Sequence, residues 1–245
     1  MALKGAKIGG YHTLKDWGLL MKVGSPKIGE AEVDEYLVQV PGSDTMLNLT
    51  NSLDGKPHYK KRTITMELKC IAPKKTWSTL YSTIANAIHG KWLQCVFDDD
   101  GAWYWEGLWK VSYTPAEFYC TFTITGTCNP LKIGVYDGSN DWLWDTFNFE
   151  KDVVRNYTDI QLTANAEVPV TVSGAPRTIG VYFKRDEAEA DISLSFNGSK
   201  VAQLAKATDW QYIEGLQFPD DTDFTLSFTA SIDCKISIKY LGGSL

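Results

Sequence analysis

The chain has 245 residues, of which 24 are Lys or Arg and 30 are Asp or Glu, giving a formal net charge of -6 at pH 7. This balance offers no basic surface for gripping a phosphate backbone, so we do not expect nucleic-acid binding. The composition, 44% hydrophobic and 22% charged, is typical of a folded globular protein and argues against a disordered one. The length suits one large β domain or two modest domains, and we expect two.

Membrane and metal signals are weak. No run of about 18 apolar residues occurs, and the opening MALKGAKIGGYH lacks the apolar core of a secretory signal, so we expect synthesis in the cytoplasm and no stable membrane insertion. The three histidines lie far apart, and the five cysteines contain no CxxC pair. We interpret the cysteines as small buried residues and expect neither a metal site nor a cofactor.

Strand patterns surround one helix pattern in the first half of the chain. Residues 62–70 read RTITMELKC, in which apolar and polar residues alternate as in a half-buried strand. Residues 76–89 predict an amphipathic helix that ends at Gly90, because apolar side chains recur at helical spacing. Residues 91–97 and 102–113 are rich in β-forming residues, and residues 117–128 alternate again.

The run Asp98-Asp99-Asp100-Gly101 separates two of these strands and permits three interpretations: a turn, an ion site or an acidic catalytic centre. The Asp-Gly step favours the positive φ angles of a hairpin turn, and short Asp side chains can hydrogen-bond to nearby backbone amides. An ion site would need further oxygen ligands, and the alternating acidic pattern of a calcium loop is absent. The sequence therefore favours a hairpin turn over the other two.

A domain boundary is expected at Asn129-Pro130, which interrupts the last of these strands. From Val153 onward only short strand-like runs appear, and Asn197-Gly198 joins two of them as a hairpin turn would. Strands at this spacing predict an antiparallel sandwich of jelly-roll type. We therefore expect one domain over residues 1–131 and a β-sandwich domain over residues 132–245.

Motifs for catalysis do not occur in the sequence: it has no nucleophile elbow, phosphate-binding glycine loop, dinucleotide fingerprint or HExxH helix. We therefore expect no catalytic residues and no enzyme. Glu106, between Trp105 and Gly107, is the best candidate for a carboxyl beside aromatic rings, as a glycan hydrolase would need. A polar position on a hairpin is the favoured interpretation, because no second acid can be named.

Several short motifs stand in a fixed order along the chain. They are YHTLKDWGLLMKVGSP from Tyr11, VPGSDTMLNLT from Val40, Tyr59 and Arg62 leading the strand RTITMELKC, YWEG from Tyr104, Cys128-Asn129-Pro130, and the closing IKYLGGSL. In these motifs and their order the chain resembles the distal tail proteins of long-tailed bacteriophages, which are hub components at the tip of a siphophage tail.

The resemblance implies a mainly β fold with one helix in the N-terminal domain. That domain would be a tail-tube-like β-barrel or sandwich, followed by a galectin-like antiparallel β-sandwich. The implied function is structural, since the chain would form a homohexameric ring at the distal end of a long non-contractile tail. The ring would join the major tail tube protein to the tail-associated lysin or central fibre protein, with receptor-binding proteins at its periphery where present. The expected location is the virion tail tip.

Ring or tube contacts are expected, on this resemblance, at the Val-Pro-Gly element, the Tyr-x-x-Arg segment and the 92–109 hairpin: Val40, Pro41, Gly42, Asp44, Leu47, Leu49, Tyr59, Arg62, Asp98, Asp99, Trp103 and Trp105. The alternative function is a carbohydrate-binding module that contacts a host cell-surface glycan. Aromatic rings stack on sugars, fill cores or anchor protein interfaces. The candidate glycan or partner contacts are Trp142, Trp144, Trp210 and Tyr212.

Overall fold

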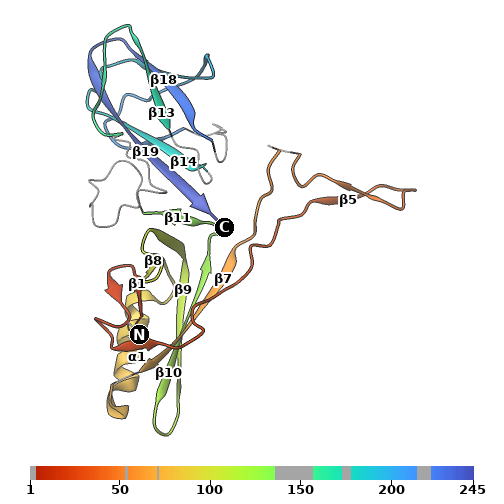
Figure 1. Ribbon diagram of the computed structural model, residues 1–245, viewed down its shortest axis with the longest axis vertical. Coiled ribbons are helices and arrows are strands. Elements are labelled where there is room, and N and C mark those ends of the chain that lie inside the picture. Colours follow the sequence, from red (N-terminus) through yellow and green to blue (C-terminus); the bar gives the residue numbers. More distant parts are fainter. Residues whose placement is uncertain (1–3, 53–54, 71, 136–156, 173–177, 214–221) are drawn as a thin grey trace. The chain divides into compact units, whose positions relative to one another are not determined.

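The computed structural model describes residues 4–52, 55–70, 72–135, 157–172, 178–213 and 222–245. These residues are mainly β-strand with one α-helix, which confirms the expected fold class (Figure 1). The chain divides into two compact units: the N-terminal unit spans Met1–Ile133 and includes Leu245, and the C-terminal unit spans Gly134–Ser244.

The N-terminal unit is built on one antiparallel sheet. Its strands run in the order β2–β1–β8–β9–β10–β7, and the short strands β3 and β4 both pair with β7. The strands are β1 (Ala6–Ile8), β2 (Tyr11–His12), β3 (Leu19–Met21), β4 (Lys27–Ile28), β7 (Arg62–Cys70), β8 (Lys91–Phe97), β9 (Trp103–Pro115) and β10 (Cys120–Cys128), with β11 (Lys132–Gly134) at the end of the unit.

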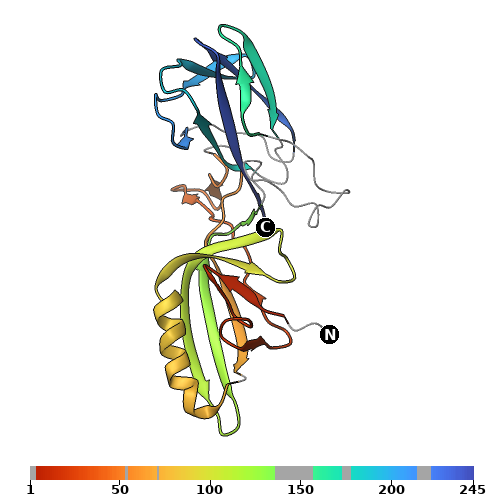
Figure 2. The same ribbon diagram turned by 90° about the vertical axis from the view of Figure 1, so that its left-hand side faces the viewer.

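One face of this sheet forms the core. Strands β7 and β10 bury every second residue, as their alternating sequences predicted. Helix α1 (Trp77–Ile88), entered through a 3-10 turn (Lys74–Thr76), buries Trp77, Ile84 and Ile88. It runs along one face of the sheet, over β9 (Figure 2). The predicted helix is confirmed to within a residue at each end. Within the described part of the chain, no helix has the length and apolar character needed to cross a membrane.

Two glycines let β9 and β10 pack closely around a tryptophan. Trp109 is fully buried, and its indole Nε1 donates to the carbonyl of Leu93 on β8 at 2.8 Å. Gly126 lies directly opposite Trp109, and a Cβ at this glycine would come within 2.6 Å of the Trp109 ring. A Cβ at Gly107 would meet the carbonyl oxygen of Thr127 at 2.5 Å. Neither position therefore accepts a side chain without movement of its neighbours.

The C-terminal unit is a sandwich of two antiparallel sheets. One sheet has the order β12–β19–β14–β17, and the other has the order β13–β18–β15–β16. The strands are β12 (Ile160–Leu162), β13 (Glu167–Val172), β14 (Thr178–Arg185), β15 (Ile192–Phe196), β16 (Ser199–Gln203), β17 (Gln211–Tyr212), β18 (Phe224–Ala230) and β19 (Cys234–Ser244). The antiparallel sandwich expected from the strand spacing is therefore present.

The interior of the sandwich is closed by contacts between the two sheets. Phe183 on β14 meets Phe228 on β18 edge-to-face, with ring centroids 5.7 Å apart. The predicted hairpin turn at Asn197-Gly198 is confirmed, because it joins β15 to β16 with φ angles of 51° and 74°.

Replacing Gly126 by alanine is expected to lower the free energy of unfolding by about 1–3 kcal/mol, because the added methyl group overpacks against the Trp109 ring. Chemical denaturation of the purified chain measures the change. Gly101→Ala is the matched control, since a Cβ at Gly101 meets nothing within 4 Å. Equal effects of the two substitutions would contradict the packing described for Trp109.

Candidate interaction site

A long segment between β3 and β7 extends away from the sheet of the N-terminal unit. From residue 21 to residue 61 no described residue is buried. Residues 30–60, called the arm below, fold back on themselves through the two-stranded sheet of β5 (Leu37–Gln39) and β6 (Met46–Asn48). Figure 1 shows β5 well away from the sheet that contains β7, β9 and β10. The arm therefore has no hydrophobic core of its own.

Backbone hydrogen bonds hold the two halves of the arm together. Close to β7, the Asp34 amide donates to the His58 carbonyl and the Lys60 amide donates to the Glu32 carbonyl, both at 2.8 Å. At the tip, Gly42 has a φ of 80°, which glycine adopts at little cost, and the chain reverses there. The arm is thus a defined ribbon although it buries nothing.

Large apolar side chains are exposed along the arm. The exposed fractions are 62% for Tyr36, 57% for Met46, 51% for Leu47, 46% for Leu37 and 41% for Val40. An isolated two-stranded hairpin is only marginally stable in water, and clustered exposed apolar side chains are typical of a surface that another protein covers. The arm therefore has the character of a contact surface.

The expected contact residues of the Val-Pro-Gly element all lie on the arm. Val40, Pro41, Gly42, Asp44 and Leu47 are exposed, and Leu49 is half-buried. Tyr59 lies on the returning half, where it bridges to Val33, and is half-buried. The structure thus gathers these residues on one projecting element, and their role as ring or tube contacts stays a prediction.

Arg62 and Trp105 come together where the arm meets the sheet. Arg62 opens β7, and its guanidinium carbon lies 5.0 Å from the centroid of the Trp105 ring on β9. The two side chains are 7% and 3% exposed. Burial lowers the pKa of Arg62, because desolvation disfavours the charged form. The Arg62–Trp105 pair belongs to the same sheet as the turn at Asp98. The pair and the turn share no contact residue.

The three aspartates after β8 form a turn, which confirms the favoured interpretation, but the positive φ angles expected at the Asp-Gly step are wrong, because neither Asp100 nor Gly101 adopts one. The Asp100 amide donates to the Phe97 carbonyl, and the Trp103 amide donates to the Asp100 carbonyl, each at 3.0 Å. Each carboxylate has a different partner. Asp99 pairs with Lys4 at 2.6 Å, and Asp100 pairs with Lys132 at 2.8 Å; the Lys132 ammonium also lies 5.2 Å from the centroid of the half-buried Trp103 ring.

Asp98 fastens the N-terminal strand to this turn. Its Oδ2 accepts from the Gly5 amide at 2.7 Å, and its Oδ1 lies 3.0 Å from Nε2 of His12. The Leu14 and Lys15 amides both donate to Nδ1 of His12 at 3.2 Å, so the neutral ring carries its proton on Nε2 and donates it to Asp98. No local pattern pairs His12 with Asp98, because the two residues are remote along the chain.

The aromatic candidates of the second half are only partly described. Trp210 and Tyr212 are 40% and 50% exposed, and the Tyr212 ring lies 5.1 Å from that of Tyr182. Trp142 and Trp144 lie outside the described residues. The possibility of a glycan or partner contact at Trp210 and Tyr212 stays a prediction.

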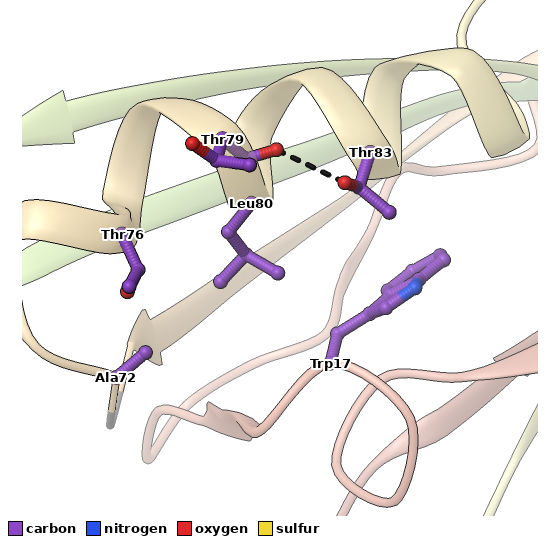
Figure 3. A pocket seen from close by; sticks show the side chains of 6 residues that line it. All are labelled: Trp17, Ala72, Thr76, Thr79, Leu80 and Thr83. Atoms are coloured by element: carbon purple, nitrogen blue, oxygen red, sulfur yellow. Dashed lines mark hydrogen bonds between the residues drawn. The ribbon is translucent and has the colours of Figure 1, made fainter.

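A shallow groove of about 320 Å³ lies beside α1. Figure 3 shows its wall of threonines on the helix, with Trp17 facing them from the opposite side. The hydroxyls of Thr76 and Thr83 donate to the carbonyls of Pro73 and Thr79, at 2.7 and 3.0 Å. The groove therefore presents no acid, base or activated nucleophile. It is lined by Trp17, Ala72, Thr76, Thr79, Leu80 and Thr83.

The buried thiols and the remaining acid offer no reactive centre. Cys70, Cys95, Cys120, Cys128 and Cys234 are all buried and unpaired by disulfides, as expected of small apolar residues. Burial raises the pKa of Cys128 to about 12 and also raises that of Cys95. Glu106 is half-buried at a position opposite Gln94 in the β8–β9 ladder. Among the described residues, no three His, Cys, Asp or Glu side chains form a metal-binding group.

Asp98→Ala is expected to lower the free energy of unfolding by about 1–2 kcal/mol, because it removes the acceptor of two hydrogen bonds that fix the N-terminal strand. Asp99→Ala is the neighbouring control, and we expect a change below about 1 kcal/mol, since its ion pair with Lys4 is exposed. Urea titration measures both. Indistinguishable losses would contradict the role assigned to Asp98.

Cys128 is expected to contribute to the loss of folding stability at alkaline pH. Its pKa is raised from 9.0 to about 12 in the folded chain, so the folded state favours the neutral thiol. The stabilisation is fully present below pH 9 and is lost as the pH rises toward 12. The free energy of unfolding, followed from pH 8 to pH 11, should fall less steeply for Cys128→Ala than for the wild type. Parallel curves would contradict this assignment.

No protein-family model matches the chain, and no curated protein matches it. Among solved structures, the chain is similar to SPP1 Dit (gp 19.1), described as a paradigm of the hub adsorption apparatus in phages that infect Gram-positive bacteria, with a TM-score of 0.58 and 11% identity. The similarity covers 100% of both chains. The chain therefore has the fold of a phage hub protein, and the resemblance expected from the motifs is confirmed at the level of the fold.

Proposed function

We propose that the chain is a structural subunit of a phage tail, six copies of which close into a ring at the distal end of a long non-contractile tail. The fold shared with a phage hub protein supports a structural role in the tail. The observation that supports the ring is the arm: none of its described residues is buried, and five of its large apolar side chains are more than 40% exposed. Such a segment is explained by a partner that covers it.

A second copy of the chain is the partner that this geometry favours. A ring built by head-to-tail contacts requires two different complementary patches on each subunit, and the rotation between neighbours must close. An arm that reaches beyond its own sheet supplies one patch. The body of the next copy supplies the other. Edges of short strands such as β5 and β6 also present unpaired amides and carbonyls to a neighbour.

The further partners belong to the same proposal. The ring would bind the last ring of the major tail tube protein on one side and the tail-associated lysin or central fibre protein on the other. Receptor-binding proteins, where present, would attach at its periphery. The function in this account is assembly and the transmission of force along the tail, and it requires no bond chemistry.

Introducing charge on the arm is expected to prevent ring formation. Leu37→Asp combined with Met46→Asp places two carboxylates among the exposed apolar side chains, at opposing ends of the β5–β6 ladder. The thermal midpoint should stay close to that of the wild type, because neither side chain is buried. The double variant should be monomeric by light scattering at concentrations where the wild type forms rings.

Val23→Asp is the matched control for this experiment, since Val23 is 97% exposed and lies outside the arm. It should assemble as the wild type does. Rings formed equally well by the arm variant would remove the arm from the interface and leave the proposed function without its main support.

A further inference from the structure

Arg62 is a buried cation without an anionic partner. Its side chain is 7% exposed, and it forms no hydrogen bond or ion pair with any residue that the structure describes. Only its Nε is shielded from solvent without a hydrogen-bond partner, whereas its two Nη atoms are not cut off from solvent. Burying part of a guanidinium is costly unless the group is paired, and the Nη atoms are the part of Arg62 that an acceptor can reach.

A second arginine, Arg185, is buried in the described part of the chain, and its guanidinium has hydrogen-bond acceptors. Arg185, in the C-terminal unit, is 1% exposed and donates from its Nη atoms to the carbonyls of Ala190 and Leu204. Only its Nε is unpartnered. Arg62 donates to no carbonyl of a described residue, so its Nη atoms remain available to an acceptor.

The surroundings of Arg62 orient its guanidinium without neutralising it. Trp105 offers a ring face 5.0 Å away, and a cation over a tryptophan is held in place by the quadrupole of the ring. Cys128, directly across the ladder from Arg62, has a neutral thiol at physiological pH because burial raises its pKa. Glu106 follows Trp105 on β9 and therefore projects from the opposite face of the sheet.

The arm carries carboxylates that have no cation. Glu30, Glu32, Asp34 and Glu35 are all exposed, and none of them forms an ion pair or a side-chain hydrogen bond with a described residue. The arm's own backbone holds Glu32 opposite Lys60, close to Arg62 along the chain, yet no ion pair with Arg62 forms. The chain thus carries a cation, Arg62, and a group of carboxylates at residues 30–35, and neither has an ion-pair partner among the described residues. The two are opposite in charge.

We propose that Arg62, held by Trp105, is one half of an anion-binding site that is completed by a carboxylate from residues 30–35 of a second copy of the chain. The inference rests on the proposed ring, and it names a contact within it. The guanidinium fork of arginine matches a carboxylate with two parallel hydrogen bonds, which fixes the orientation of the incoming arm as well as its position. Because donor and acceptor lie on different parts of the subunit, the contact is head-to-tail and can propagate around a ring.

Two complementary variants test the contact. The first is Arg62→Gln, and the second neutralises the arm through Glu30→Gln, Glu32→Gln, Asp34→Asn and Glu35→Gln. Each should weaken self-association at least about tenfold, because each removes one partner of a desolvated charge pair. Lys61→Gln is the matched control, since it removes a neighbouring positive charge whose ammonium lies over the Trp92 ring. Native mass spectrometry measures the assembly state, and circular dichroism verifies folding.

Mixing the two variants gives the decisive result. The arm of the Arg62→Gln variant can bind Arg62 of the arm variant. The neutralised arm of the second variant cannot bind the glutamine of the first, so only one of the two contacts forms. At a concentration where neither variant assembles alone, the mixture should therefore contain heterodimers and no rings. The arm variant changes only exposed side chains, so this half of the test does not depend on how Arg62→Gln folds.

The outcomes separate this contact from the ring itself. Rings that persist in both variants, or a mixture of monomeric variants that yields no heterodimer, would overturn the Arg62 contact and leave the ring standing. A wild-type chain that remains monomeric under all conditions would overturn both.

Discussion

The packing of Trp109 between β8 and β10 is the contact on which the N-terminal unit depends. The indole occupies space that Gly126 leaves free, and its Nε1 is tied to the Leu93 carbonyl, so one side chain joins three neighbouring strands. This fixes the register of β9 against β10. The same register places Trp105 under Arg62 and sets the base from which the arm leaves the sheet. Packing inside the unit thus determines what the unit presents to a partner.

Core and arm have opposite physical characters, and the contrast suits a subunit of an assembly. The sheet and α1 enclose a continuous apolar cluster, and no described residue between β3 and β7 belongs to it. Folding of the N-terminal unit therefore does not require the arm. The apolar and acidic side chains of the arm remain available for association, where hydrophobic burial supplies affinity and charge pairs supply orientation.

Sequence patterns predicted the regular elements well and the three-dimensional site poorly. The alternation in β7, the helical spacing of α1 and the two turns at Asp98–Gly101 and Asn197-Gly198 are local signals, and the structure confirms each of these elements. Only the second turn has the positive φ angles that its residues predicted. The strand expected over 117–128 begins only at Cys120, because the chain first turns at residues 116–119. Such local patterns predict secondary structure, but they do not show which exposed residues another subunit would cover.

Contacts between remote residues had no local signal. The arm has an ordinary mixture of apolar and polar residues, and nothing in that mixture shows that its described residues pack against no core. The pairing of His12 with Asp98 and the stacking of Arg62 on Trp105 both join residues that are more than forty positions apart. Arg62 and Trp105 were each expected at an interface on resemblance alone, and the structure adds that they form a pair.

Ring formation is tested by the native mass of the wild-type chain across a dilution series, with negative-stain images of the same material. We expect a species six times the 27.4 kDa mass of the chain, seen as a ring with a central opening. Dilution should take it to monomers that remain folded, because the arm is not part of the core. A monomer at every concentration, or a compact dimer without an opening, would contradict the account.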